Sequence, residues 1–113
     1  MATLNREIEA DGLDVQLQQE GERVVVRVRG ELDLSSAKEF EAKLRQVIRE
    51  SSFGVILDLG GVTFIDSTGL RVLISAATLS HASRRELIVL RGSAQALQVI
   101  ETSGVEDLLP LAD

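Results

Sequence analysis

The chain contains no cysteine among its 113 residues. The fold therefore depends on no disulfide bond, and the protein has neither a thiolate nucleophile nor a cysteine ligand for a metal ion. A sequence without cysteine suits a reducing compartment, and we expect the protein to be cytoplasmic.

Positive charge and long apolar runs are also lacking. The formal net charge is −6, and no basic cluster offers the positive surface that nucleic acid and anionic membranes require. No apolar run approaches the roughly 20 residues needed to cross a bilayer, and the first residues lack the basic and apolar segments of a secretory signal. We therefore expect a soluble binding protein that has neither nucleic acid nor a membrane as its partner.

Catalytic motifs are the third absence. His81 is the only histidine, and it lies in the same predicted helix as Ser67, roughly 20 Å away at ~1.5 Å per residue. The two residues therefore do not form a nucleophile–base pair. The sequence also lacks Walker, HExxH and Cys/His metal-binding patterns. We expect no enzyme activity, no cofactor and no bound metal, and we interpret His81 as an exposed residue near a helix end.

The length and patterning of the chain indicate one domain with a single core. Residues 1–12 are mostly polar, carry mixed charges and show no strong periodicity, so we expect a loosely ordered tail there. Residues 13–113 show no repeat, linker or low-complexity tract, and we expect them to form the ordered domain.

Two segments near the start alternate apolar and polar residues, with Glu-Gly-Glu between them. This pattern predicts a β-hairpin. The alternating apolar positions are Leu13, Val15 and Leu17 in the first strand and Val24, Val26 and Val28 in the second. Further strands are predicted at residues 55–59 and 86–90, with a turn at Gly60–Gly61 and a short closing strand within residues 105–111.

Three later segments carry apolar residues at helical spacing. The first contains Ser36 and Glu39, which have the spacing of a capping box, and the second ends near Ser83. The third lies between Ser93, a predicted N-cap, and Gly104, a predicted stop. The inward residues are Ala37, Phe40, Leu44, Val47 and Ile48 in the first helix, Leu70, Leu73, Ile74 and Ala77 in the second, and Leu97 and Ile100 in the third.

Strands and helices alternate after the hairpin, which requires right-handed crossovers. We therefore predict a single α/β domain with a mixed, mostly parallel β-sheet and an N-terminal β-hairpin. Polar residues such as Arg27, Arg29 and Asp58 alternate with apolar ones in the strands. Strands covered on both faces are almost continuously apolar, so we expect helices mainly on one face of the sheet.

Three polar residues, Asp66, Ser67 and Thr68, precede the apolar part of the second helix. The first turn of a helix has free N–H groups and the positive end of the helix dipole, so it can hold a phosphate. Such residues also serve simply as caps, but one residue is sufficient for a cap. The segment lies at the carboxyl edge of the predicted sheet, where α/β proteins place their sites.

Glu31 and Asp33 follow the second strand and are expected at the same edge. The alternative for this pair is a solvated loop followed by a helix start. The second helix also carries Val72, Ala76 and Leu79 on a flank, where we favour packing against neighbouring elements over docking of a partner.

Three stretches of the chain resemble the STAS family. They are GELDLSSA after the hairpin, VILDLGGVTFIDSTGLRVLISA in the middle and VIETSGVEDLLPL near the end. The resemblance runs from about Leu13 to Leu111 and implies that residues 13–113 are a STAS-like domain. The size of the chain also resembles that of a stand-alone anti-sigma factor antagonist, a protein that binds an anti-sigma factor serine kinase.

The resemblance also implies roles for single residues. Ser67 directly follows the motif aspartate, where the family has its phosphoacceptor. The unphosphorylated form is then expected to bind the kinase and free the sigma factor, phosphorylation to block binding, and a metal-dependent serine phosphatase to restore it. ATP and Mg²⁺ belong to these partners. The implied partner-binding residues are Glu31, Asp33, Asp66, Ser67, Thr68 and Gly69.

One residue departs from the family pattern, and two other functions compete. Arg71 stands where some members have a small residue; we interpret it as solvated, with contact to the phosphate or to a partner acid as alternatives. The chain also resembles non-catalytic STAS subunits of transporter or sensory complexes, in which Ser67 would be only a cap. A phosphoaspartate receiver domain would use Asp66 but needs a lysine after a late strand, whereas the only lysines are Lys38 and Lys43.

Overall fold

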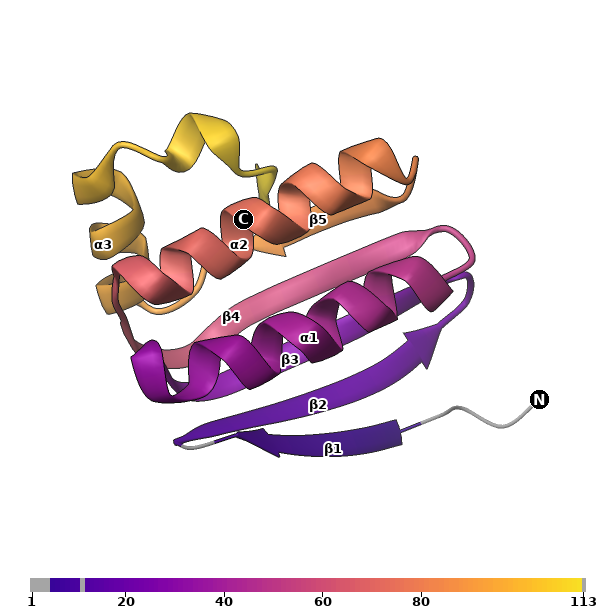
Figure 1. Ribbon diagram of the computed structural model, residues 1–113, viewed down its shortest axis with the longest axis horizontal. Coiled ribbons are helices and arrows are strands. Elements are labelled where there is room, and N and C mark those ends of the chain that lie inside the picture. Colours follow the sequence, from indigo (N-terminus) through magenta and orange to yellow (C-terminus); the bar gives the residue numbers. More distant parts are fainter. Residues whose placement is uncertain (1–4, 11, 113) are drawn as a thin grey trace.

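The structure is a computed structural model that describes residues 5–10 and 12–112 (Figure 1). The elements follow one another as strands and helices in the order that the sequence predicts after the hairpin. They are β1 (Asn5–Ala10), β2 (Leu13–Glu20), β3 (Arg23–Leu32), α1 (Leu34–Glu50), β4 (Gly54–Ile65), α2 (Ser67–Ala82), β5 (Glu86–Leu90), α3 (Ala94–Ser103), the 3₁₀ helix η1 (Glu106–Leu108) and β6 (Leu111–Ala112).

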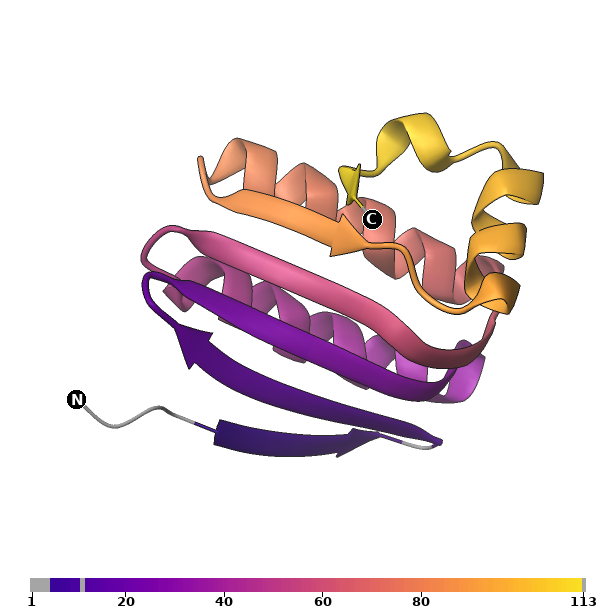
Figure 2. The same ribbon diagram turned by 180° about the vertical axis from the view of Figure 1, so that it is seen from behind.

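The strands form one mixed sheet in the order β1-β2-β3-β4-β5-β6. The pairs β1–β2 and β2–β3 are antiparallel, whereas β3–β4, β4–β5 and β5–β6 are parallel. Helices α1 and α2 lie side by side on one face, and the view from behind shows the opposite face without a helix (Figures 1 and 2). The predicted α/β class, the hairpin and the one-sided helical layer are confirmed.

The N-terminal segment contains a strand where the sequence analysis expected a loosely ordered tail. Residues 5–10 form β1, which pairs with β2 in a register that sets Ile8 opposite Val15. Ile8 is flanked by charged residues, so the segment gives little apolar periodicity, and its pairing depends on the exposed backbone edge of β2. Residues 1–4 and 11 of the expected tail lie outside the described residues.

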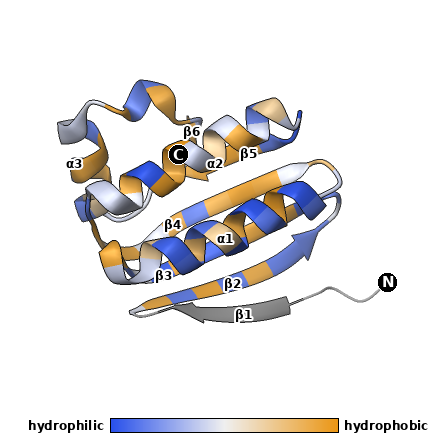
Figure 3. Ribbon diagram, viewed as in Figure 1, coloured by the Kyte–Doolittle hydropathy of each residue, from blue (hydrophilic) through white to orange (hydrophobic). Residues whose placement is uncertain are grey.

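The core lies between the helical layer and the sheet. Along β2, apolar and polar residues alternate (Figure 3), and the apolar ones are buried in the core. Helix α1 buries Phe40, Leu44 and Ile48 as predicted, with Val47 partly buried. In α2 the predicted stripe is rotated: Leu70 and Leu73 are buried together with Val72 and Ala76, whereas Ile74, Ala77 and Leu79 are partly buried. The packing interpretation of the flank is therefore confirmed.

Strand β4 is longer than the sequence predicted. Gly60–Gly61 does not form a turn but lies inside β4, where the register against β3 shifts between Arg27 and Arg29. A Cβ at Gly61 would lie 2.4 Å from Cγ of Arg29, so glycine permits the close approach of the two strands at this bulge. A Gly-Gly pair signals a turn or a bulge equally well, and the bulge here carries β4 on to Ile65.

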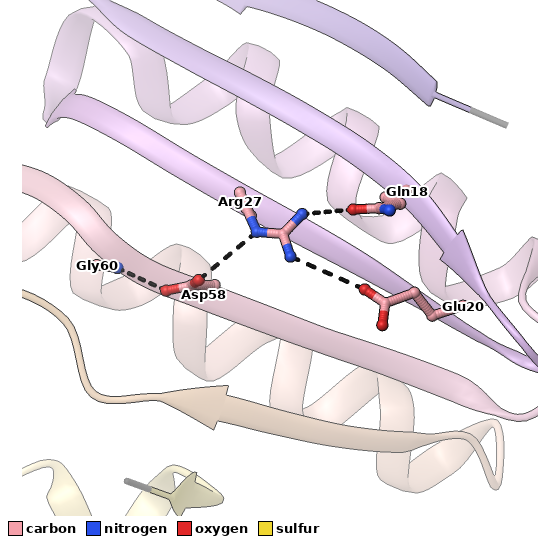
Figure 4. A network of polar contacts seen from close by, with 5 residues as sticks. All are labelled: Gln18, Glu20, Arg27, Asp58 and Gly60. Atoms are coloured by element: carbon pink, nitrogen blue, oxygen red, sulfur yellow. Dashed lines mark hydrogen bonds and ion pairs between the residues drawn. The ribbon is translucent and has the colours of Figure 1, made fainter. Parts of the chain in front are cut away.

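The face of the sheet without helices carries a network of polar side chains around Arg27 (Figure 4). Nη1 of Arg27 donates to Oε1 of Gln18 at 2.7 Å, and Nε lies 3.9 Å from Oδ2 of Asp58. Glu20 lies 3.8 Å from the same guanidinium, while Asp58 also accepts from the N–H of Gly60 at 2.8 Å. This network explains why polar residues alternate with apolar ones in β2, β3 and β4.

Helix α3 lies at the end of the sheet where β3 and β4 stop (Figure 1). Its predicted caps are confirmed, because Ser93 accepts from the N–H of Ala96 at 3.2 Å and Gly104 ends the helix in the left-handed conformation. The Ser93 hydroxyl also donates to the carbonyl of Val62, which fastens α3 to the last part of β4.

Candidate functional site

The site is built where two parallel strands end and two helices begin. Leu32 of β3 pairs with Ile65 of β4, and each strand is followed at once by an acidic N-cap, Asp33 for α1 and Asp66 for α2. The N-termini of both helices therefore meet at one edge of the sheet (Figure 1). This is the carboxyl edge at which the sequence analysis placed the candidate residues.

Asp66 joins the starts of the two helices. Its Oδ1 accepts from the N–H of Gly69 at 2.9 Å, and its Oδ2 accepts from the N–H of Leu34 at 3.2 Å. Its own N–H donates to the carbonyl of Leu32 at 3.3 Å. One carboxylate thus caps α2, satisfies an N–H in the first turn of α1 and sits at the positive ends of both helix dipoles.

Asp33 caps α1 by a different arrangement from the one predicted. Its Oδ1 accepts from the N–H of Ser35 at 3.0 Å and from the hydroxyl of Ser35 at 2.7 Å. The capping box joins Asp33 with Ser36, whose Oγ accepts from the N–H of Asp33 at 3.1 Å, and not Ser36 with Glu39. The hydrogen bond from the Ser35 hydroxyl is the main cause that lowers the pKa of Asp33 below its usual value.

Ser67 is the first residue of α2 and is exposed. The cap of α2 is supplied by Asp66, and the Ser67 hydroxyl forms no hydrogen bond with any residue in the described ranges 5–10 and 12–112. Thr68 follows it and is half-buried. Of the two residues that could have capped this helix, Asp66 is the one that does so, and the Ser67 hydroxyl projects from a fixed helix start toward solvent.

Glu31 and Gly69 differ in their access to solvent. Glu31 is exposed at the end of β3, where its N–H donates to the carbonyl of Gly12 at 2.9 Å. Gly69 is buried, and a Cβ there would lie 2.5 Å from the carbonyl oxygen of Leu32. Gly69 therefore does not offer a surface to a partner. Its N–H binds Asp66, and its lack of a side chain lets α2 pack closely against Leu32.

Two apolar residues at this edge escaped the sequence analysis. Leu34 is 77% exposed in the first turn of α1, and Phe64 is 48% exposed two residues before Asp66. Leu34 has helical spacing to Ala37, so the pattern alone favours a core position. Its exposure follows from the point at which the sheet ends, directly after the observed cap Asp33, and the sequence pattern carries no signal of it.

The chemistry available at the site is limited to hydroxyls, carboxylates and helix N–H groups. Among the described residues, no group of three or more His, Cys, Asp and Glu side chains is placed to hold a metal ion. His81 is exposed near the far end of α2. Within the same described ranges, no helix is both long enough and apolar enough to cross a membrane. The arrangement is suited to binding and to modification of the Ser67 hydroxyl.

The sequence is similar to known proteins over most of its length. The family model described as "Mlab, STAS domain" matches residues 15–110. The anti-sigma-B factor antagonist of Staphylococcus aureus (strain NCTC 8325 / PS 47) is 29% identical over 84 residues, which cover 74% of this chain and 78% of that protein.

Solved structures of an anti-sigma factor antagonist have the same fold as this chain. The unphosphorylated form of the anti-sigma factor antagonist SpoIIAA is 26% identical, with a TM-score of 0.70 over 88% of both chains. The phosphorylated form of the Bacillus protein SpoIIAA gives a TM-score of 0.65 at 26% identity, over 88% of this chain and 91% of that one. The murine anion transporter Slc26a9 shares the fold at 20% identity and a TM-score of 0.68, over 80% of this chain and 15% of that chain.

Proposed function

The chain belongs to the STAS domain family, and we propose that it is an anti-sigma factor antagonist whose partner binding is switched by phosphorylation of Ser67. In its unphosphorylated form it binds an anti-sigma factor serine kinase in the cytoplasm and so releases the sigma factor. Phosphorylation blocks this binding, and a serine phosphatase reverses the block. ATP and Mg²⁺ belong to the partners, and the chain itself is not a catalyst. Family membership sets the receiver-domain alternative aside.

The observation that carries the proposal is that Asp66, and not Ser67, caps α2. Asp66 supplies the cap of α2 and the link to α1, so the neighbouring hydroxyl has no structural hydrogen bond to lose. A kinase can therefore modify Ser67 without removing a contact of the fold. The relatives support the same function, because SpoIIAA is an anti-sigma factor antagonist that has been solved in unphosphorylated and phosphorylated forms.

The electrostatics of the edge explain how a phosphate would act. A phosphoserine adds a charge of about −1.5 to −2 directly beside Asp66, at an edge that also carries Glu31 and Asp33. The helix dipole and the N–H groups of the first turn of α2 stabilise the phosphate in place. The partner meets a strongly anionic surface where it fitted a neutral hydroxyl, so affinity falls through repulsion and desolvation without a change of fold.

Calorimetric titration against the anti-sigma factor kinase of the same organism tests the proposal. Ser67→Ala is expected to bind as the unphosphorylated wild type does and to resist phosphorylation. Ser67→Asp should weaken binding by a few kcal/mol at most, up to about two decades in the dissociation constant. Ser52→Asp is the matched control, because Ser52 is exposed between α1 and β4, at the opposite end of the sheet from Ser67.

Incubation with the kinase and Mg-ATP should place one acid-stable phosphate on the wild type and none on Ser67→Ala. Equal affinities for wild type, Ser67→Ala and Ser67→Asp, in folded proteins, would contradict the phosphoswitch. That result would favour the second candidate, a non-catalytic STAS subunit of a transporter or sensory complex. The match to a segment of an anion transporter is the observation in its favour.

A further inference from the structure

A second concave surface lies toward the other end of α2. It is a groove of about 410 Å³ between the C-terminal half of α2, the start of β5 and the segment from η1 to β6, here called the α2–β6 groove. Figure 1 shows this segment, in yellow, returning from α3 toward β5. The α2 residues of the groove, Ala77 to His81, begin roughly 15 Å beyond Ser67 at ~1.5 Å per residue. The groove is thus separate from the Ser67 site.

The floor of the α2–β6 groove is apolar. Leu87 of β5 and Leu109 after η1 are each 6% exposed and line the groove together with Ala77. Leu108, which is 58% exposed, adds an apolar side chain. The volume falls in the range of small-ligand pockets, roughly 300–1,000 Å³. An apolar ligand body in this groove would remove its own surface and that of Leu108 from water, whereas Leu87 and Leu109 already have little exposed surface.

Arg85 gives the groove a fixed positive charge. Its Nε donates to the carbonyl of Ser51 at 2.8 Å, and its Nη1 donates to the carbonyl of Ser83 at 3.3 Å. These carbonyls hold the half-buried guanidinium in place, but they do not neutralise it. In the described part of the chain, Arg85 forms no ion pair with a carboxylate. The remaining N–H groups of its fork are therefore suited to an anion.

Two other titratable residues line the groove. Asp107 is the one acidic residue among those that line it, and His81 contributes an imidazole from α2. Both are exposed, whereas Arg85 is half-buried. Attraction to Arg85 and repulsion from Asp107 both grow with the charge of the anion, so the charges alone do not select its valence. The planar fork of Arg85 matches the two oxygens of a carboxylate, and the leucines beside it suit an apolar body.

We propose that the α2–β6 groove binds a small amphiphilic carboxylate. The carboxylate group pairs with the guanidinium of Arg85, and the apolar chain lies over Leu87 and Leu109. This site is independent of the proposed phosphoswitch, because it uses none of the residues around Ser67.

Titration of the ¹⁵N-labelled full chain with octanoate tests the proposal, with octanol and octylammonium as neutral and cationic probes of the same length. Octanoate should give saturable amide shifts in the second half of α2, the start of β5 and residues 107–110. It should bind about tenfold more tightly than either other probe, as expected for a charge-assisted contact. The absence of localised shifts at millimolar octanoate, or equal affinity for octanol, would overturn the site.

Four single variants separate the charge of the groove from its structure. Arg85→Gln should lower octanoate affinity about tenfold, Arg85→Lys should retain part of it, and Asp107→Asn should raise it. Arg84→Gln is the matched control, because it removes the neighbouring positive charge outside the groove and should leave the affinity unchanged. If Arg85→Gln is unfolded by the loss of its carbonyl contacts, the octanoate affinities of Arg85→Lys and Asp107→Asn still test the proposal. Weaker binding to Asp107→Asn than to the wild type would contradict the proposal.

Discussion

The carboxylate of Asp66 accepts a hydrogen bond from the N–H of Leu34, a residue 32 positions earlier in the chain. The same carboxylate caps its own helix through the N–H of Gly69. The start of α1 and the start of α2 are therefore held together by one side chain, and Ser67 is fixed relative to both helices. The rigid presentation of the Ser67 hydroxyl depends on its neighbour.

Replacing Asp66 should cost more stability than replacing Ser67. Asp66→Ala removes a helix cap, which contributes about 0.5–2 kcal/mol, and leaves the N–H of Leu34 without its acceptor, at about 1 kcal/mol more. Ser67→Ala should change the free energy of unfolding by less than about 0.5 kcal/mol. Urea denaturation of both variants measures this. A Ser67→Ala variant that loses as much stability as Asp66→Ala would show that the hydroxyl has a structural role after all.

The exposed pair Leu34 and Phe64 should serve as apolar anchors for the partner. If the kinase binds this edge, Leu34→Ser and Phe64→Ser should each weaken binding by about 1–3 kcal/mol, the usual range for anchor residues. Leu34 is largely exposed, so Leu34→Ser should change the free energy of unfolding by less than about 0.5 kcal/mol. Phe64 is half-buried, so Phe64→Ser should cost up to about 1.5 kcal/mol, and its binding is compared in variants shown to be folded. Leu108→Ser is the control, because Leu108 is 58% exposed but lies near β6. Comparable losses for all three variants in calorimetry would argue against a specific apolar contact at this edge.

The interaction between Asp33 and Ser35 should make stability depend on pH in one direction. The Ser35 hydroxyl lowers the pKa of Asp33, so the folded state favours the ionised carboxylate. The resulting stabilisation is fully present above the unfolded-state pKa, near 4, and is lost as the pH falls through the lower pKa of the folded state.

Ser35→Ala should raise the pKa of Asp33 toward its usual value, as followed by carboxyl ¹³C shifts. The difference in unfolding free energy between wild type and Ser35→Ala should be present at pH 7 and shrink on acidification below pH ~4. Ser103→Ala, at the end of α3, is the control for loss of a hydroxyl. An unchanged Asp33 titration in Ser35→Ala would show that the hydroxyl is not the cause of the shift.

Replacing Gly69 with alanine should destabilise the fold. A Cβ there would lie 2.5 Å from the carbonyl oxygen of Leu32 and 2.8 Å from Cγ1 of Ile65. Although alanine is the better helix former, overpacking of this kind costs about 1–3 kcal/mol, so Gly69→Ala should be destabilised in thermal or urea unfolding. Gly60→Ala is the matched control, since its Cβ would approach only the flexible Asp58 carboxylate, at 3.0 Å. Equal stabilities for the two variants would remove this explanation for the glycine.

The sequence predicted strands and helices correctly where the apolar periodicity is strong. The alternation of Leu13, Val15 and Leu17 predicted β2, and the helical spacing of Phe40, Leu44 and Ile48 predicted α1, because burial of one face imposes these patterns. The weakly patterned β1 could not be predicted, since its pairing depends on the backbone of β2. Gly60–Gly61 was misread, because two glycines accommodate a bulge as readily as a turn.

The sequence placed the candidate residues at one edge of the sheet, but it did not show which of them caps the helix. The run Asp66, Ser67 and Thr68 and the resemblance of its motif identified the segment. Which of these residues caps the helix depends on the distances between the Asp66 oxygens and two N–H groups, one of which belongs to a distant part of the chain. The exposure of Leu34 likewise depends on where the sheet ends, and periodicity carries no information on that point.

The short pairing of β6 has a consequence for hydrogen exchange. In the part of the chain that the structure describes, β6 pairs with just Val89 and Leu90, in contrast to the long β3–β4 ladder at the centre of the sheet. Local opening follows such differences in contact, so amide protons of residues 105–112 should exchange through a low-energy opening that leaves β3 and β4 closed. The wall of the α2–β6 groove is then the least protected part of the ordered C-terminal segment. Octanoate should slow exchange there while leaving the amides around Ser67 unaffected.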